Sequence, residues 1–584
     1  KGKFNRQILI PLEGNQGPYK LQGANNELYF VVLAGTERIY IDGELLQRGE
    51  DQDYVINYNT AEITFTPNRI ITKDKRIQTE FEYADRNYLN SQIYASNEIN
   101  YNNKLLLNIA AYSNTDAKNS AIDQPLDVKQ KQFLSNLGDS INNAFYSNAQ
   151  IDSFAVGKIL YRKTDTLYNL IYTDSVYVIS NNPNDILYNL SFSYIGPGKG
   201  NYMPLRNATN GQAFEWISPG SQNEKMGEWE PVTLLVTPKK LQIISLGINY
   251  NLFPKTNIIA EAAISNYDNN LFSSLDKNDN KAFAGKIILD NKAKQLKLFN
   301  NTYSFQSLLS YEYVGKNFRP IERLRNVEFF RDWSLPFESP QVQENIANAE
   351  FTLIKTKTSL KYIFTNYNRG DSYKGIRNFI EMNSQIKTLQ TKAIISLLNF
   401  TTDLQTGVFF RPYAELKKSF TKLNNIETGL KYSGEYNNIS VSNYDSISPL
   451  SFAFNSYEAF LKSNPLKQNK WGASYNYRIN QLPLRDKLVN TDYSNNYNVF
   501  AELMKNENQQ LRVNVTYRDL QVLNNSLGIK KENEHTLLGR TEYSLQTLKG
   551  FFIGNFLYEI GSGQEQKREF AYLEVPAGQG EYAW

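Results

Sequence analysis

The sequence contains no cysteine, which excludes disulfides, thiolate chemistry and cysteine metal sites. It contains a single histidine, His535, so a zinc or iron site that needs two histidines is impossible. A Ser-His-Asp arrangement would have to use His535, which begins a strand-like run, and we do not expect one. No apolar run approaches the roughly 20 residues of a membrane-spanning helix. Membrane residence, if it exists, must therefore come from strands.

An excess of charge of either sign is also absent. The 63 basic and 59 acidic residues give a net charge of +4 and form no blocks, so the sequence gives no electrostatic reason to expect a nucleic-acid partner. Residues 276–280 alternate acidic and amide side chains as in a calcium loop. That segment lacks the glycine at its sixth position and carries Ile287 in place of the bidentate glutamate, so we expect a hairpin tip. No carboxylate pair stands out, and we expect no metal, no cofactor and no enzymatic activity.

Aromatic residues are abundant, although the chain is polar on average. They make up 13% of the residues, with 40 Tyr and 33 Phe, while the mean hydropathy is −0.52. Tyrosine suits a membrane–water interface, because its ring is apolar and its hydroxyl stays hydrated. A soluble, Tyr-rich β protein of the cell surface would have the same composition.

Residues 1–90 have the pattern of a small β domain. Short β-rich runs are separated by turn signals such as Asp42-Gly43 and Arg48-Gly49. Residues 76–83 then alternate with a period of two, as a half-buried strand does.

From residue 91 the strands become longer. Residues 471–480, for example, place Trp471, Ala473 and Tyr475 on one face, and Gly472 and Ser474 on the other. The same alternation recurs in several segments, among them 258–265, 426–435 and 511–518. An apolar outward face opposite a polar inward face is typical of membrane strands.

The number and length of these segments predict the fold class. Roughly 18 of them lie between residues 91 and 560, longer than the five or six residues of soluble strands and joined as hairpins. We therefore predict an all-β protein, a transmembrane antiparallel β-barrel of roughly 18 or more strands. A soluble multi-sheet protein remains the alternative, because alternation also suits a sandwich.

One long interruption divides the barrel strands. Residues 115–238 differ in character, and within them Asp127 to Phe145 carries apolar residues at spacing four, which predicts a helix. We expect residues 91–114 to form the first barrel hairpin and 239–560 the main barrel strands. The insertion of 115–238 would be an α+β plug, cap or gate, or alternatively a long surface loop folded on itself.

A weak internal repeat has the form Gly-x-Gly-x-Tyr. It recurs as Gly198, Gly200 and Tyr202, as Gly578, Gly580 and Tyr582, and in a variant form around Gly14 to Tyr19. We interpret it as a turn that closes a strand pair, with glycine at positive φ and tyrosine packing afterwards.

The connection from residue 319 to residue 333 is dense in arginine and aromatic residues. Its members are Arg319, Arg323, Arg325, Phe329, Phe330, Arg331 and Trp333. Such a loop would fold into the lumen or dock a partner, since arginine and aromatic side chains are good interface anchors. Alternatively its charges pair locally.

Four segments resemble large, mostly uncharacterised outer-membrane β-barrel proteins of Bacteroidota. They are Leu33 to Glu50, Asp53 to Thr66, Asn317 to Trp333 and Val575 to Trp584. A looser similarity, to the translocon barrel of the type 9 secretion system, rests on Asp53 to Thr66. Proline and glycine precede Trp584 and make a poor strand, so we expect 561–584 to begin a further Gly-rich β insertion and the barrel to be incomplete within these residues.

The resemblance implies a location and an architecture. We expect an integral outer-membrane barrel of a Gram-negative bacterium that acts in transport, protein secretion or envelope assembly, with residues 1–90 in the periplasm. Outer-membrane lipid or lipopolysaccharide would surround it, and other outer-membrane or periplasmic proteins would be its partners. The alternative is a soluble or tethered cell-surface β protein that binds glycans.

Overall fold

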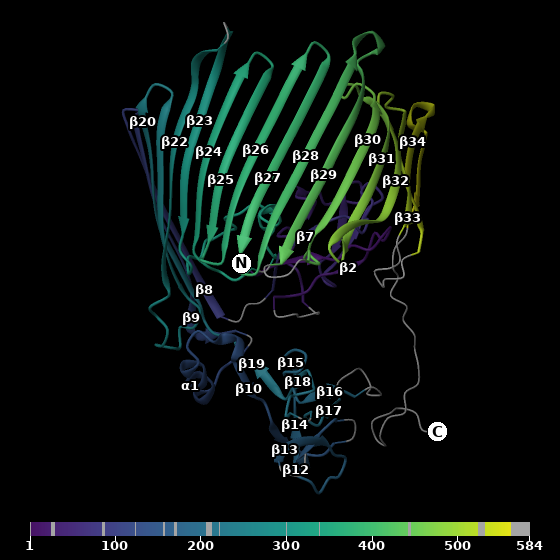
Figure 1. Ribbon diagram of the computed structural model, residues 1–584. Coiled ribbons are helices and arrows are strands. Elements are labelled where there is room, and N and C mark those ends of the chain that lie inside the picture. Colours follow the sequence, from purple (N-terminus) through teal and green to yellow (C-terminus); the bar gives the residue numbers. More distant parts are fainter. Residues whose placement is uncertain are drawn as a thin grey trace.

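The computed structural model consists of a small N-terminal β domain, a large curved sheet and a domain inserted between two strands of that sheet (Figure 1). It describes residues 2–24, 30–84, 88–122, 124–155, 158–168, 172–205, 213–220, 222–298, 301–337, 339–441, 446–523 and 532–561.

The N-terminal domain contains two small sheets that share one core. One sheet has the order β1-β7-β3-β4 and the other β2-β6-β5. The strands are β1 (Lys3–Leu9), β2 (Tyr19–Lys20), β3 (Arg38–Ile41), β4 (Glu44–Leu45), β5 (Tyr54–Asn57), β6 (Glu62–Phe65) and β7 (Ile77–Tyr83). Along β7, Ile77, Phe81 and Tyr83 point into the core, whereas Gln78 and Glu80 are also buried but lie outside that core. Something other than this domain therefore covers its second face.

Eighteen long antiparallel strands form the curved sheet. They are β8 (Tyr88–Tyr101), β9 (Leu105–Ala121), β20 (Lys240–Phe253), β21 (Thr256–Asp268), β22 (Lys281–Leu298), β23 (Asn301–Val314), β24 (Glu344–Lys355), β25 (Thr358–Arg369), β26 (Tyr373–Ile386), β27 (Leu389–Thr402), β28 (Gln405–Phe420), β29 (Ile426–Val441), β30 (Phe452–Lys462), β31 (Asn469–Leu484), β32 (Lys487–Leu503), β33 (Gln509–Val522), β34 (Glu534–Thr547) and β35 (Phe552–Ile560). Short helices α2 (Phe329–Asp332), η3 (Thr421–Leu423) and η4 (Leu548–Gly550) interrupt the connections. The predicted run of roughly 18 alternating strands is thus confirmed as one antiparallel sheet.

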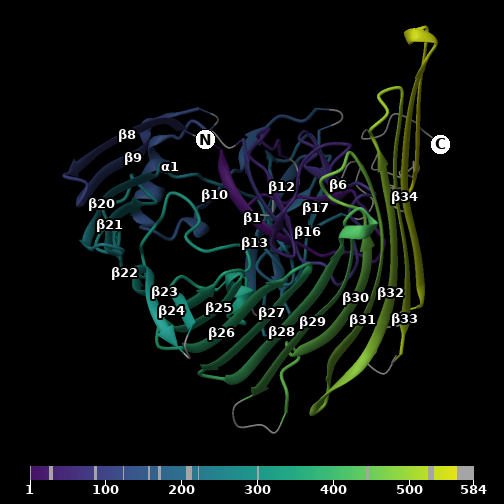
Figure 2. The same cartoon turned by 90° about the horizontal axis from the view of Figure 1, so that it is seen from above.

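Neighbouring strands pair in a single series. It begins with β8 and β9, continues through β9 and β20, and then follows the chain from β20 to β35. Seen from above, the sheet curves around the N-terminal domain (Figure 2). Among the described residues no strand register joins β35 to β8. The pairing therefore shows an 18-stranded antiparallel sheet, and its closure into a complete barrel stays a prediction.

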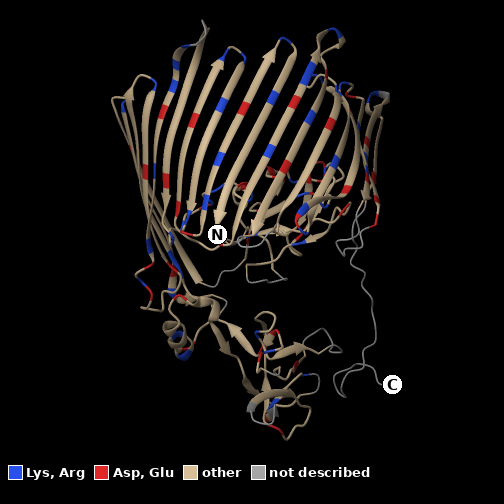
Figure 3. Ribbon diagram, viewed as in Figure 1, with Lys and Arg blue, Asp and Glu red and all other residues tan. Residues whose placement is uncertain are grey.

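The two faces of the curved sheet differ in chemistry. On the convex face the strands expose large apolar side chains. They include Ile244, Ile264, Ile287, Leu309, Phe351, Leu360, Ile380, Ile395, Leu416, Leu430, Tyr457, Tyr475, Tyr497, Val515 and Leu537, one from each strand from β20 to β34. The concave face carries Asn, Ser, Lys, Arg and Glu side chains, and the charged positions recur along the strands (Figure 3). The strict period of two produces this separation.

The inserted domain lies between β9 and β20. It contains α1 (Val128–Asn136), η1 (Ile141–Asn143) and the strands β10 (Phe145–Ser147), β11 (Gln150–Asp152), β12 (Tyr161–Tyr168), β13 (Tyr172–Ile179), β14 (Leu187–Asn189), β15 (Ser193–Tyr194), β16 (Tyr202–Pro204), β17 (Phe214–Trp216), β18 (Trp229–Glu230) and β19 (Val232–Leu234). The predicted helix is shorter than expected, because Gly138 adopts a φ of +59° and ends it. The loop after β21 docks on α1, where the Asn270 amide donates to the carbonyl oxygens of Leu134 and Gly138, both at 2.8 Å.

The two small domains lie at different places relative to the curved sheet. Figure 1 shows the inserted domain below the lower edge of the sheet, whereas Figure 2 shows the N-terminal domain within its curvature. Of the roles predicted for the insertion, which were plug, cap, gate or surface loop, the plug position is taken by the N-terminal domain, which contacts the concave face. The physical reason is charge complementarity between that domain and the sheet, in which Glu13 and Asp74 meet Arg518.

Candidate functional site: the interface between the N-terminal domain and the concave face

A buried arginine on the sheet forms the centre of the interface. Arg518 lies on the concave face of β33, and its side chain is only 3% exposed. Its guanidinium pairs with Glu13 and with Asp74, whose Oδ2 lies 3.0 Å from Nη2. On the sheet, it also donates to Ser494 Oγ at 2.8 Å. Every anion that it meets comes from the N-terminal domain, so this arginine joins the two parts of the chain.

Asp74 receives further cations from both sides of the interface. Lys73 Nζ lies 3.0 Å from its Oδ1, and Arg478 Nε on β31 lies 3.7 Å from its Oδ2. Burial alone would raise the pKa of this carboxyl, but the charges of Arg478, Lys73 and Arg518 outweigh it and lower the pKa to about 2. The carboxylate therefore stays ionised at any physiological pH.

Lys73 also bridges to the sheet. Its ammonium lies 2.8 Å from Oδ1 of Asp492 on β32, and the same Asp492 oxygen accepts from the Asn480 amide at 2.7 Å. Asn480 in turn donates to Asp74 at 3.0 Å. A network of this kind is costly to leave half-satisfied, because a buried charge without a partner is strongly unfavourable. The network therefore favours one seating of the domain.

The Arg-rich connection between β23 and β24 covers the other side of the N-terminal domain. Arg323 Nη1 lies 2.9 Å from Glu80 Oε1, and Arg76 Nε lies 3.1 Å from Glu328 Oε2. Gln78 Nε2 also donates to Glu328 at 3.3 Å. These contacts explain why the second face of β7 is buried.

The same connection is anchored to the concave face of the sheet. Arg325 binds Glu344 at 2.6 Å and also pairs with Glu312, while Arg331 pairs with Glu435. Trp333 is buried against Tyr367, with ring centroids 4.9 Å apart. The charges of this connection therefore pair locally, and the connection also lies on the concave face, so these two predictions for it are compatible.

The remaining predicted residues of the connection lie along the same path. The Arg319 guanidinium stacks over the Tyr267 ring at 5.3 Å, and Phe330 lies 5.7 Å from the guanidinium of Arg6 of the N-terminal domain. Phe329 packs edge-on against Tyr367 at 5.3 Å. The structure thus brings the predicted residues into one layer between the N-terminal domain and the sheet.

A ladder of alternating charges crosses the concave face beyond this layer. Its members, one on each strand from β24 to β30, are Glu350, Lys361, Glu381, Lys392, Glu415, Lys431 and Glu458. Lys361 lies 2.7 Å from Glu350, Lys392 3.6 Å from Glu381 and Lys431 3.0 Å from Glu458. Along this ladder four glutamates alternate with three lysines, so the concave wall presents both signs of charge side by side.

Sequence reasoning missed both the Arg518 network and the ladder. Glu13 and Arg518 are 505 residues apart, and no local pattern connects them. The ladder had a detectable signal, because each member occupies a polar position of an alternating strand. Only the strand register, however, brings Lys361 opposite Glu381 and Lys392 opposite Glu415.

The Gly-x-Gly-x-Tyr element of the inserted domain lies away from this interface. Gly198 has a φ of +66°, and Gly200 forms a bridge with Gly227 so closely that a Cβ would lie 2.4 Å from the Trp229 nitrogen. Tyr202 follows as a buried residue of β16. Gly578, Gly580 and Tyr582 lie outside the described residues.

Two kinds of feature are absent from the described residues. No helix there is long and apolar enough to cross a membrane. Nor do three or more His, Asp or Glu side chains converge in those ranges as a metal site.

Comparison with known proteins identifies one region of this chain. Residues 4–85 match the model of a family described as a domain of unknown function (DUF8818). That match covers the N-terminal domain, the part that lies within the curved sheet. No curated protein matches the chain.

Proposed function

We propose that the chain is an outer-membrane β-barrel whose lumen is occupied by its own N-terminal domain. The proposal rests on the convex face, where fifteen consecutive strands each expose a large apolar side chain on the same side of the sheet. Soluble monomers rarely expose a contiguous apolar patch larger than a few hundred Å². Strands of 9 to 18 residues are also long enough to cross a bilayer, where about 9–11 residues suffice.

In this proposal the sheet closes by bringing β8 beside β35. Both strands have the exposed residues of an unpaired edge, and an open edge is not tolerated in the hydrocarbon region of a membrane. The resemblance to outer-membrane proteins of Bacteroidota supports the same location, with lipid or lipopolysaccharide around the barrel. The role would be in transport, secretion or envelope assembly.

A pair of arginine substitutions on one strand tests the membrane assignment. Ile395 and Ile394 are neighbours on β27, but Ile395 lies on the exposed apolar face and Ile394 lies on the concave face, opposite Glu381. An arginine at the lipid-facing midplane costs about 2–4 kcal/mol. We expect Ile395→Arg to reduce the fraction of protein that is membrane-inserted and heat-modifiable in gels.

Ile394→Arg is the matched control, because it adds the same side chain at the same depth beside a carboxylate. It should insert normally. Equal behaviour of the two variants, or a wild-type chain that is monodisperse without detergent, would contradict the membrane assignment. In the second case the glycan-binding surface protein becomes the better explanation.

A disulfide tests whether the N-terminal domain acts as a plug. A Cβ built on Gly14 lies 3.3 Å from the Thr536 Cβ on β34, close to the roughly 3.5–4.5 Å between the Cβ atoms of a disulfide. The chain has no other cysteine, so Gly14→Cys with Thr536→Cys forms a single defined cross-link.

We expect the oxidised double variant to block solute flux and to remain blocked in planar bilayers. Reduction should restore whatever opening the wild type shows. The two single-cysteine variants control for strain at position 14, where φ is +66°. An oxidised form that conducts as well as a conducting reduced form would contradict the plug, whereas failure of Ile395→Arg to impair insertion would contradict the barrel itself.

A further inference from the structure

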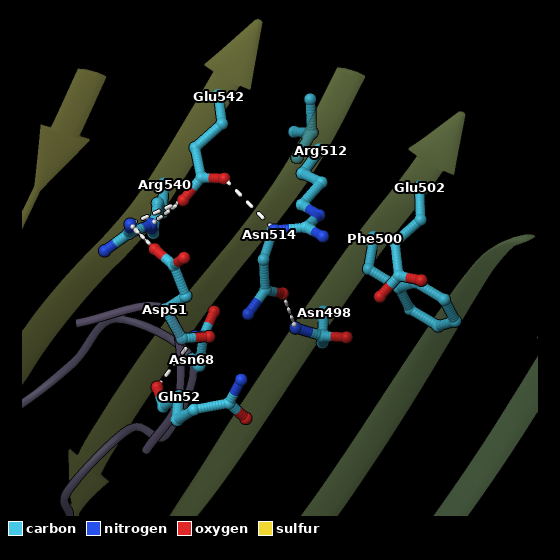
Figure 4. Close-up of a pocket in the computed structure, with 11 residues that line it drawn as sticks. Asp51, Gln52, Asn68, Asn498, Phe500, Glu502, Arg512, Asn514, Arg540 and Glu542 are labelled. Carbon is cyan, nitrogen blue, oxygen red and sulfur yellow. Dashed lines mark hydrogen bonds and ion pairs between the residues drawn. The ribbon is translucent and has the colours of Figure 1, made fainter. Parts of the chain in front are cut away.

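A crevice remains between the N-terminal domain and the concave face of β32 to β34. It has a volume of about 460 Å³. Gln52 and Asn68 line it from the domain, and Asn498, Phe500 and Asn514 line it from the sheet (Figure 4). That volume falls within the roughly 300–1,000 Å³ of small-molecule sites.

Several carboxamide groups in the crevice retain hydrogen-bonding capacity. Asn498 Nδ2 donates to Asn514 Oδ1 at 2.9 Å and to Thr516 Oγ1 at 2.8 Å, so its donor side is used and its Oδ1 is left to accept. Asn68 Nδ2 donates to the carbonyl oxygens of Gln52 and Asp51, at 2.9 and 3.2 Å, so its donor side is used as well. Within the described ranges, no partner accepts from Asn514 Nδ2, and the Gln52 side-chain amide has none either. The Gln52 carboxamide can therefore donate and accept at once, while Asn514 adds a donor and Asn498 an acceptor.

The charged groups at the rim are already engaged in ion pairs, including Glu502, whose partner Lys470 Nζ lies 3.8 Å away. Arg540 Nη2 lies 2.7 Å from Asp51, and the same guanidinium also pairs with Glu542 and Glu559. Arg512 Nη1 lies 3.5 Å from Glu542. A charged ligand would have to compete with these pairs, whereas a neutral polar ligand would not.

Phe500 adds an apolar surface beside the amides. Its ring lies over β31, where a Cβ on Gly472 would approach it to 2.6 Å. An aromatic ring next to amides that both donate and accept matches a sugar, which has an apolar C–H face and hydroxyls that do the same. In the buried Arg518 network, by contrast, the described polar side chains already have partners.

From these observations we infer that the crevice binds a neutral carbohydrate, a mono- or disaccharide, between the N-terminal domain and the sheet. Because Gln52 and Asn514 belong to the two different parts, the bound sugar holds the domain against the sheet. The inference does not depend on whether the sheet spans a membrane.

Calorimetric titration of the full chain with maltose, cellobiose and N,N′-diacetylchitobiose tests the site. We expect at least one of them to bind, and Asn514→Leu and Phe500→Leu each to weaken that binding by about fivefold or more. Gln510→Leu is the control, because Gln510 lies on the same face of β33 but does not line the crevice.

Three results would overturn the inference. They are no binding of any of the three sugars, equal binding by Asn514→Leu and Gln510→Leu, and tighter binding of a uronic-acid disaccharide than of its neutral counterpart. A second readout guards against misfolding, because sugar should slow the modification of a Gln78→Cys thiol in the wild-type background. That residue is buried only while the domain remains in place.

Discussion

Removing the Arg518 guanidinium should loosen the N-terminal domain. The substitution Arg518→Gln keeps a polar side chain on β33 but deletes the charge that Glu13 and Asp74 share. These carboxylates are only 6% and 10% exposed, so neither can recover its hydration while the domain is seated.

The magnitude follows from what each carboxylate retains. Removing one partner of a buried ion pair typically costs about 3–5 kcal/mol. Asp74 keeps Lys73 at 3.0 Å and Arg478 at 3.7 Å, and Glu13 still accepts from the Lys73 backbone N–H at 3.0 Å. The lower end, about 3 kcal/mol, is therefore appropriate, and it corresponds to roughly a hundredfold change in the seating equilibrium.

Maleimide labelling of Gln78→Cys measures that equilibrium in a chain without other thiols. Gln78 is 6% exposed and faces Glu328, on the side of the domain away from the core, so it reacts only when the domain leaves its seat. We expect Arg518→Gln to accelerate labelling by roughly a hundredfold.

Arg512→Gln provides the matched control on the same strand and face. Its side chain is 50% exposed and pairs with Glu542 at 3.5 Å, and exposed pairs contribute little. Labelling should change by less than about threefold. If Arg518→Gln labels no faster than Arg512→Gln, the buried network does not hold the domain, and the reasoning is refuted.

Three further predictions concern pH, packing and selectivity. The pKa of Asp74 is lowered to about 2, so the ionised carboxylate contributes about 2 kcal/mol to the seating of the domain above pH 4, and this contribution is lost as the pH falls towards 2. Labelling of Gln78→Cys should therefore accelerate between pH 4 and pH 2, and a flat profile would argue against the role of Asp74. Trp333→Ala removes a ring that is 1% exposed and packed on Tyr367, so it should destabilise the protein by about 3–5 kcal/mol. The variant should lose its heat-modifiable gel migration at a lower temperature, and an unchanged temperature would show that Trp333 does not anchor the connection. Replacing Lys361, Lys392 and Lys431 by glutamine leaves the glutamates of the ladder without their lysine partners. Any conductance should then become more cation-selective, measured as a shift in the reversal potential, and an unchanged reversal potential would place the ion path elsewhere.

The sequence by itself determined the strands and their faces. Alternation is a local property: with a period of two, Tyr475 must lie opposite in direction to Ser474 and Asn476, whatever the neighbouring strands are. The same logic separated the exposed apolar face from the charged one, and it marked Arg319 to Trp333 as an unusual connection.

Only the tertiary structure decided which domain occupies the concave face. Local patterns showed a small β domain at the N-terminus and an insertion after β9, and either could have filled the space. The choice depends on Arg478 and Arg518 meeting Asp74 and Glu13, more than 400 residues away along the chain. Such a pairing follows from strand register and curvature, because an isolated charge in a sequence carries no information about which distant charge will neutralise it.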